Sequence, residues 1–152
     1  MYEFVDRPVK SLRRGGELVI WAMRHWVSAA GKGRCPCGDV APAFHKRDLM
    51  AAFPHFHMMM AVLNREAILQ LRFGPIGCER VTEHEALLLS LLRAMHLNPG
   101  EQTRATAAMI VAPDSVTTLT IAMTAFAQGL SDANLLPRVP LYLGQHASSD
   151  DE

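Results

Sequence analysis

Cysteine and histidine side chains gather in one stretch of the chain. All three cysteines and four of the seven histidines lie between residues 35 and 84: Cys35, Cys37, Cys78, His45, His55, His57 and His84. Thiolates and imidazoles are the ligands that zinc and the softer metals prefer in proteins. Metal binding is therefore the first chemistry that the sequence suggests.

A structural zinc ion needs four ligands on one centre. Cys35, Cys37 and Cys78 would supply three thiolates, and one of His55, His57 or His84 would supply the fourth ligand. The Cys-Pro-Cys spacing is shorter than that of a typical zinc knuckle, and the second half of the site offers a single cysteine. Zinc binding is therefore the second hypothesis for this chain, with no cofactor expected otherwise.

A Cu(I) site is a weaker alternative. His55-Phe56-His57 is followed by the three consecutive methionines 58–60, and thioethers bind Cu(I) well. Consecutive residues of a helix point in different directions, however, so these methionines are better explained as core filler.

Cys78 could also be a reactive thiol, since it precedes a predicted helix N-terminus and has Arg80 and His84 nearby in the sequence. No asparagine or aspartate stands in an obvious orienting position for a cysteine–histidine pair. We therefore assign no catalytic residue, and a disulfide is not expected either, because Cys35 and Cys37 are too close in sequence to pair easily.

Charge is distributed unevenly along a chain whose formal net charge is zero. Residues 1–47 carry nine Lys/Arg and four Asp/Glu, whereas residues 48–152 carry six and eleven. The first helix has a predicted basic outer face made by Arg7, Lys10, Arg13, Arg14 and Arg24. This face makes a DNA-associated regulator the third hypothesis, although no helix-turn-helix pattern accompanies it and self-complementary charge explains the asymmetry more simply.

The composition predicts an all-α fold. Hydrophobic residues make up 49% of the 152 residues, charged residues 20% and aromatic residues 7%. That balance excludes a disordered chain and favours helices over sheet. We predict a single helical domain over residues 1–145, with five to six helices around a central apolar helix at about 83–97, and a disordered acidic tail over 146–152.

The hydrophobic spacing locates most of the helices. A 3-4 repeat marks one over 8–31, with Gly16 on its seam as the expected point of close helix packing. Residues 31–42 are predicted as a loop, followed by helices from about Pro42 to Phe53 and from Pro54 to Gln70. Thr82 and Glu85 form a capping box for the central helix. Later helices are expected up to about Val111 and from residue 116 to Gly129.

No signal peptide is readable, and no apolar run approaches the length of a membrane span. A reducing cytoplasm is the expected compartment. The apolar, proline-spaced segment over 135–143 is expected to dock in extended form on the body of the protein or on a partner. Together with the methionine-rich and leucine-rich helices, it suggests a homodimer or a helical protein partner. The leading hypothesis is a non-enzymatic helical interaction or regulatory domain that self-associates.

Overall fold

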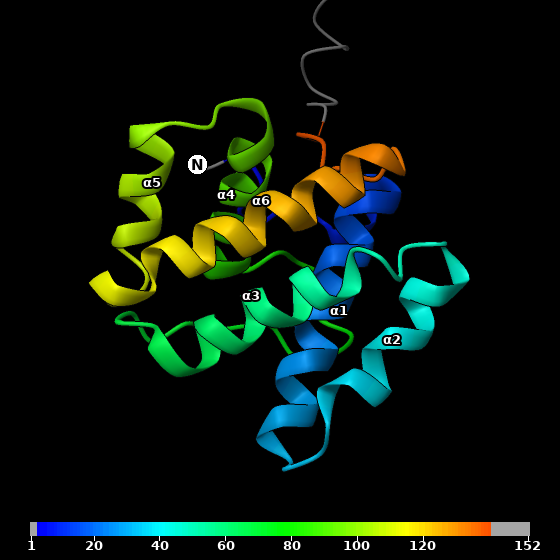
Figure 1. The fold of residues 1–152 in the computed structure, drawn as a ribbon. Helices are drawn as coiled ribbons and strands as arrows, with labels where there is room; N and C mark the ends of the chain where they lie inside the picture. The colour runs from blue at the N-terminus through cyan, green and yellow to red at the C-terminus, as the bar shows by residue number, and fades with distance from the viewer. Residues whose placement is uncertain (1–2, 141–152) are drawn as a thin grey trace, which may run out of the picture.

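The computed structural model describes residues 3–140, and these fold into six α-helices (Figure 1). Their bounds are α1 (Arg13–Gly31), α2 (Pro36–Lys46), α3 (Phe53–Glu66), α4 (Glu83–Leu97), α5 (Glu101–Ala108) and α6 (Val116–Asp132). Short 3-10 helices, Val9–Leu12 and Pro113–Ser115, precede α1 and α6. Between residues 3 and 140 the only extended pairing consists of two isolated bridges. The predicted all-α fold is confirmed.

Helix α4 begins where the sequence predicts. The Thr82 hydroxyl accepts the amide of Glu85, and the Glu85 carboxylate accepts the amide of Thr82, so the predicted capping box is confirmed. The helix is buried along its apolar face and packs against α1, α5 and α6. Helix α6 shares the central position, because it runs across the molecule and packs against α3, α4 and α5 (Figure 1).

An aromatic cluster joins three of the helices in the core. Phe44 of α2 lies 5.2 Å from Phe53 and 5.3 Å from Phe56 between ring centroids, and both partners belong to α3. Phe56 in turn meets Phe126 of α6 edge to face at 5.3 Å. Because edge-to-face pairs add to the free energy of apolar burial, this cluster fixes α2 and α3 on α6.

Glycines permit close backbone approach at two places. A Cβ atom at Gly15 would collide with the backbone carbonyl of Leu135, so α1 packs directly on the segment that follows α6. A Cβ at Gly16 would meet only the Leu12 side chain of the preceding turn, so the predicted close contact belongs to Gly15 and not to Gly16. Gly129, predicted as a helix stop, lies inside α6, and a Cβ there would lie 2.7 Å from the Cβ of Ala52.

The predicted loop over 31–42 is largely helical, which corrects the sequence-based expectation. Helix α2 starts with Pro36 in its first turn and Asp39 near its positive end, both of which favour a helix start. Pro42 lies within the helix, where it cannot donate to the carbonyl of Gly38. The local composition resembled a loop, and burial of Val40 and Phe44 in the core decides the outcome.

The segment after α6 docks on the helices as predicted, as far as it is described. Leu135, Pro137 and Pro140 are buried, and Arg93 donates a 2.8 Å hydrogen bond to the carbonyl of Pro137. The rest of that segment and the predicted acidic tail at 146–152 lie outside the described residues. In the part of the chain that is described, no helix combines the length and the apolar character needed to cross a membrane.

Candidate functional site

The predicted metal ligands separate into three places. Cys35 precedes α2 and is exposed, while Cys37 in the first turn of α2 contacts His57 of α3, with Sγ 3.6 Å from Nδ1. Cys78 lies elsewhere, with its thiol 3.4 Å from the carbonyl oxygen of Arg80. The ring nitrogen Nδ1 of His84 accepts the amide of Arg72 at 2.8 Å.

Within residues 3–140 no group of three or more Cys, His, Asp or Glu side chains is placed to hold a metal ion. The structure thus brings one cysteine–histidine pair of the hypothetical zinc site together and leaves Cys78 and His84 apart from it. The three methionines considered for copper also diverge, because Met59 and Met60 are buried in the core and Met58 is exposed.

Arg24 is buried in the structure, whereas the sequence analysis predicts it on an exposed basic face. Its guanidinium forms a two-point ion pair with Glu85, with Nε–Oε2 at 2.8 Å and Nη2–Oε1 at 2.9 Å. It also donates to the carbonyl oxygens of Cys78 at 2.6 Å and of Arg80 at 2.8 Å. The predicted basic face therefore loses one of its members to the interior.

The Glu85 carboxylate is held in its charged form. Burial opposes ionisation, but hydrogen bonds from Arg24 and from the amides of Thr82 and Gly74 outweigh it and keep the pKa of Glu85 below its ordinary value. Hydrogen bonding to Glu85 raises the pKa of Arg24 against the opposing effect of burial. Together these contacts fix the loop over 74–81 against α1 and α4.

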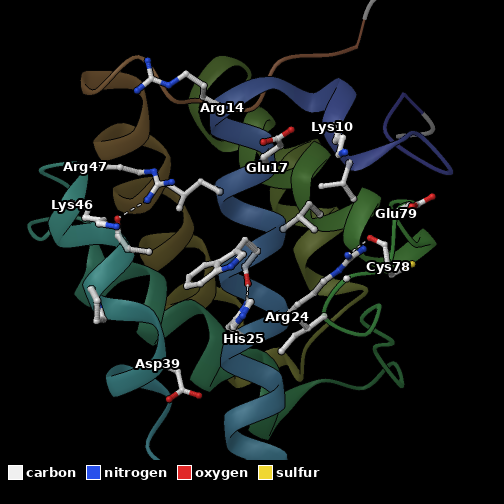
Figure 2. Close-up of a pocket in the computed structure, with 18 of the residues that line it drawn as sticks. Lys10, Arg14, Glu17, Arg24, His25, Asp39, Lys46, Arg47, Cys78 and Glu79 are labelled. Carbon is white, nitrogen blue, oxygen red and sulfur yellow. Dashed lines mark hydrogen bonds between the residues drawn. The ribbon is translucent and has the colours of Figure 1, made fainter.

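That loop forms one side of a large open groove. Helix α1 makes the floor, the C-terminal half of α2 makes the opposite wall, and the volume between them is about 1350 Å³. Figure 2 shows Arg14 on α1, Lys10 on the 3-10 helix before it, Lys46 and Arg47 on the α2 side, and Cys78 and Glu79 on the loop side. The groove thus joins two consecutive helices with a loop that is distant from them in the sequence.

Four exposed cations border the groove without an ion-pair partner among the described residues: Lys10, Arg14, Lys46 and Arg47. Two carboxylates, Glu17 and Glu79, also border it, and a third, that of Asp39, is already paired with Arg34 at 2.7 Å. The unpaired charges therefore leave a positive excess that an anionic ligand would neutralise.

An aromatic pair on α1 also lines the groove. The Trp21 ring stacks on His25 with centroids 4.0 Å apart and 37% of its surface exposed. His25 is itself fixed, since its Nδ1 lies 2.8 Å from the Trp21 carbonyl oxygen (Figure 2). On the loop side, Ile76 adds an exposed apolar side chain. The groove therefore offers apolar and cationic contacts together.

Sequence reasoning found half of this site. It predicted Lys10 and Arg14 as exposed basic residues on the first helix, and the structure places both along the groove, Arg14 on α1 and Lys10 on the 3-10 helix before it. It missed the α2 wall as a binding surface. A helix from about Pro42 that contains Lys46 and Arg47 was predicted, but these two residues entered only the charge count of residues 1–47. The signal that could have revealed this helix is its charge pattern, with Asp39 in the first turn and Lys46 in the last turn. The chain matches no protein-family model, no curated protein and no solved structure.

Proposed function

We propose that this chain is a non-enzymatic interaction domain that binds an acidic peptide segment of a partner protein in the groove between α1 and α2. The observation that carries this proposal is that four cations without an ion-pair partner among the described residues line the same groove as an exposed tryptophan: Lys10, Arg14, Lys46 and Arg47 with Trp21. Charge attraction brings the peptide to the groove, and an apolar side chain of the peptide covers Trp21 and Ile76.

A peptide suits the groove better than nucleic acid does. The carboxylates of Glu17 and Glu79 stand among the cations and would repel a continuous line of phosphates. A peptide can place its acidic side chains beside the cations and a neutral or basic one beside the carboxylates. Helix α1 is moreover the floor of a hollow and flanked by walls, whereas a helix that reads a DNA groove must protrude.

The proposal is tested by titrating the full chain with a synthetic acidic peptide that alternates glutamate and leucine, by calorimetry at two salt concentrations. Neutralising one cation of the floor and one of the α2 wall, in the double variant Arg14→Gln/Lys46→Gln, should weaken binding by about 5- to 30-fold, since each exposed charge contact contributes roughly 0.5–1 kcal/mol. The matched control is Lys32→Gln/Arg65→Gln, which removes two exposed cations outside the groove.

Three results would overturn the peptide assignment. The first is that the control variant weakens binding as much as the groove variant does. The second is that duplex DNA of equal charge binds more tightly than the peptide. The third result concerns a second copy of the chain, which the sequence predicts as a partner. If sedimentation velocity showed a dimer that the groove variant dissociates, the groove would be occupied by another copy of this chain.

Self-association by another surface stays a prediction. The exposed large apolar side chains of the described residues are spread over several elements and include Met50, Met58, Leu97, Met109 and Ile121. The same sedimentation experiment on the unmodified chain measures it directly.

A further inference from the structure

The two cysteines of the Cys-Pro-Cys sequence stand in contrasting surroundings at the start of α2. Cys35 is the residue before the helix, has an extended backbone with φ −72° and ψ 115°, and exposes its thiol. Cys37 is the second residue of the helix and is half-buried against α3. Both thiols are free.

The surroundings shift the pKa values of the two thiols in opposite directions. The backbone amides of Cys37 and Gly38 at the helix start, followed by the Cys37 thiol, lower the pKa of Cys35. Burial, followed by the neighbouring Cys35, raises the pKa of Cys37. When one proton is shared between them, the exposed sulfur is therefore the thiolate and the half-buried one keeps its hydrogen.

His57 completes the arrangement from α3. The indole Nε1–H of Trp26 donates to Nδ1 of His57 at 3.0 Å, so Nδ1 acts as an acceptor and the neutral ring carries its proton on Nε2. The sulfur of Cys37 lies 3.6 Å from Nδ1 and 3.9 Å from Nε2, so the ring packs directly against that thiol. The ring thus helps to hold the Cys37 side chain in place at the start of α2.

We propose that Cys35 and Cys37 form a redox-active dithiol that reduces disulfide substrates, with Cys35 as the attacking thiol, Cys37 as the resolving thiol and His57 as a positioning residue. The proposal rests on the placement of these three side chains, and it is independent of the groove. It also differs from the zinc hypothesis, which would need the same thiols as permanent ligands.

The exchange takes two balanced steps. The Cys35 thiolate attacks one sulfur of a substrate disulfide RS–SR, forming Cys35–S–SR and releasing RS⁻. The Cys37 thiol then loses its proton to solvent and attacks the Cys35 sulfur, forming the Cys35–Cys37 disulfide and releasing the second RS⁻. The substrate gains two electrons and the protein loses two.

The backbone can accommodate that product. Residues two apart have Cα atoms roughly 5–7 Å apart, which overlaps the range of about 4.4–6.8 Å found in disulfides. The extended conformation of Cys35 lies outside the helix, so its side chain can turn toward Cys37 without unwinding α2. The sequence-based objection to pairing neighbouring cysteines is weaker for a residue at a helix boundary than for two residues within a helix.

The test uses the full chain with Cys78→Ser, so that only the two thiols of interest remain, and the aromatic disulfide DTNB as the substrate. Stopped-flow absorbance should show two thionitrobenzoate ions released per chain, the second by an intramolecular step whose rate does not depend on DTNB concentration. Intact mass spectrometry should then find a protein lighter by two hydrogen atoms and free of any adduct.

Single variants assign the roles. Cys37→Ser should release one thionitrobenzoate and keep one adduct on Cys35, whereas Cys35→Ser should react at least about tenfold more slowly through the less accessible Cys37. His57→Asn should slow the second release and leave the first unchanged, which a general loss of packing would not do. Circular dichroism checks that each variant is folded.

Three outcomes would overturn the proposal. Stable adducts on both cysteines would mean that they do not resolve, and equal reactivity of the two single variants would remove the distinction between attacking and resolving thiols. Elemental analysis of untagged protein is the third check, since one zinc per chain, with thiols that react only after chelation, would assign them to a metal.

Discussion

The guanidinium of Arg24 and the carboxylate of Glu85 face each other edge to edge, with both nitrogen–oxygen distances below 3.0 Å. Arg24 belongs to α1 and Glu85 to the first turn of α4, so the pair connects two helices that contact each other little otherwise. Arg24 also lines the groove and binds two carbonyls of the loop opposite α2. One buried pair therefore holds a helix junction and one wall of the proposed binding site.

Breaking this pair should destabilise the fold strongly. Glu85→Gln leaves a buried guanidinium without its counter-charge, and we expect the free energy of unfolding to fall by about 3–5 kcal/mol in urea denaturation. Thr82→Ala is the control, because it removes the helix cap and an exposed hydrogen bond to the Arg72 carbonyl but leaves the ion pair intact, and it should cost about 1 kcal/mol. In the double variant Arg24→Met/Glu85→Gln the losses should be clearly less than additive, and additivity within about 0.5 kcal/mol would show that the two side chains are not coupled.

Stability should also depend on pH through Glu85. Its pKa is lower in the folded protein than in the unfolded chain, so the contribution of the carboxylate is fully present above the unfolded pKa of about 4.3 and is lost as pH falls through the folded pKa. The difference in unfolding free energy between the unmodified protein and Glu85→Gln should be constant from pH 7 to about pH 5 and shrink below that. A difference that grows on acidification would contradict the assignment.

The glycines offer a matched pair of substitutions. Gly15→Ala would drive a methyl group into the Leu135 backbone, which has little freedom to move, and should lower the unfolding free energy by roughly 1–3 kcal/mol. Gly38→Ala places the same methyl group in α2, where no other atom lies within 4 Å, and should raise it by about 0.5–1 kcal/mol. Thermal or urea unfolding distinguishes the two, and equal effects would refute the close contact at Gly15.

The two tryptophans should differ in solvent access. Trp21 on the groove floor is 37% exposed and Trp26 is 4% exposed, so acrylamide should quench the first and spare most of the emission of the second. Trp21→Phe should abolish the quenchable component, while Trp26→Phe retains it. If the acidic peptide occupies the groove, its addition should protect the remaining Trp21 signal. Unchanged quenching at saturation would place the peptide elsewhere.

The features that the sequence predicted well are local ones. The capping box of Thr82 and Glu85 depends on residues three apart, so its residue types alone determine it. The apolar spacing that located α1, α4 and α6 is likewise repeated within each helix. Segments whose structure follows from neighbours in the chain were therefore placed close to their observed bounds.

The features that the sequence missed depend on distant partners. Nothing near Arg24 in the chain indicates that it will be buried, because its partner lies 61 residues away and two more acceptors belong to the same remote segment. The first half of α2 was missed for a related reason, since its proline and glycine content favours a loop and the aromatic cluster around Phe44 overrides that preference. The helix predicted from about Pro42 to Phe53 overlaps only the second half of α2, which ends at Lys46. The groove could not be predicted for the same reasons, because its two walls are α2 and the loop that Arg24 binds.

The contact between Gly15 and Leu135 also constrains how the chain is assembled during synthesis. Helix α1 leaves the ribosome early, yet the surface on which its glycine packs is made by one of the last described segments. That face of α1 therefore stays uncovered during synthesis until α6 and the segment after it have emerged. Such a long-range contact makes folding slower than in a bundle of sequential hairpins, because α1 reaches its final packing only when a segment more than a hundred residues later docks on it.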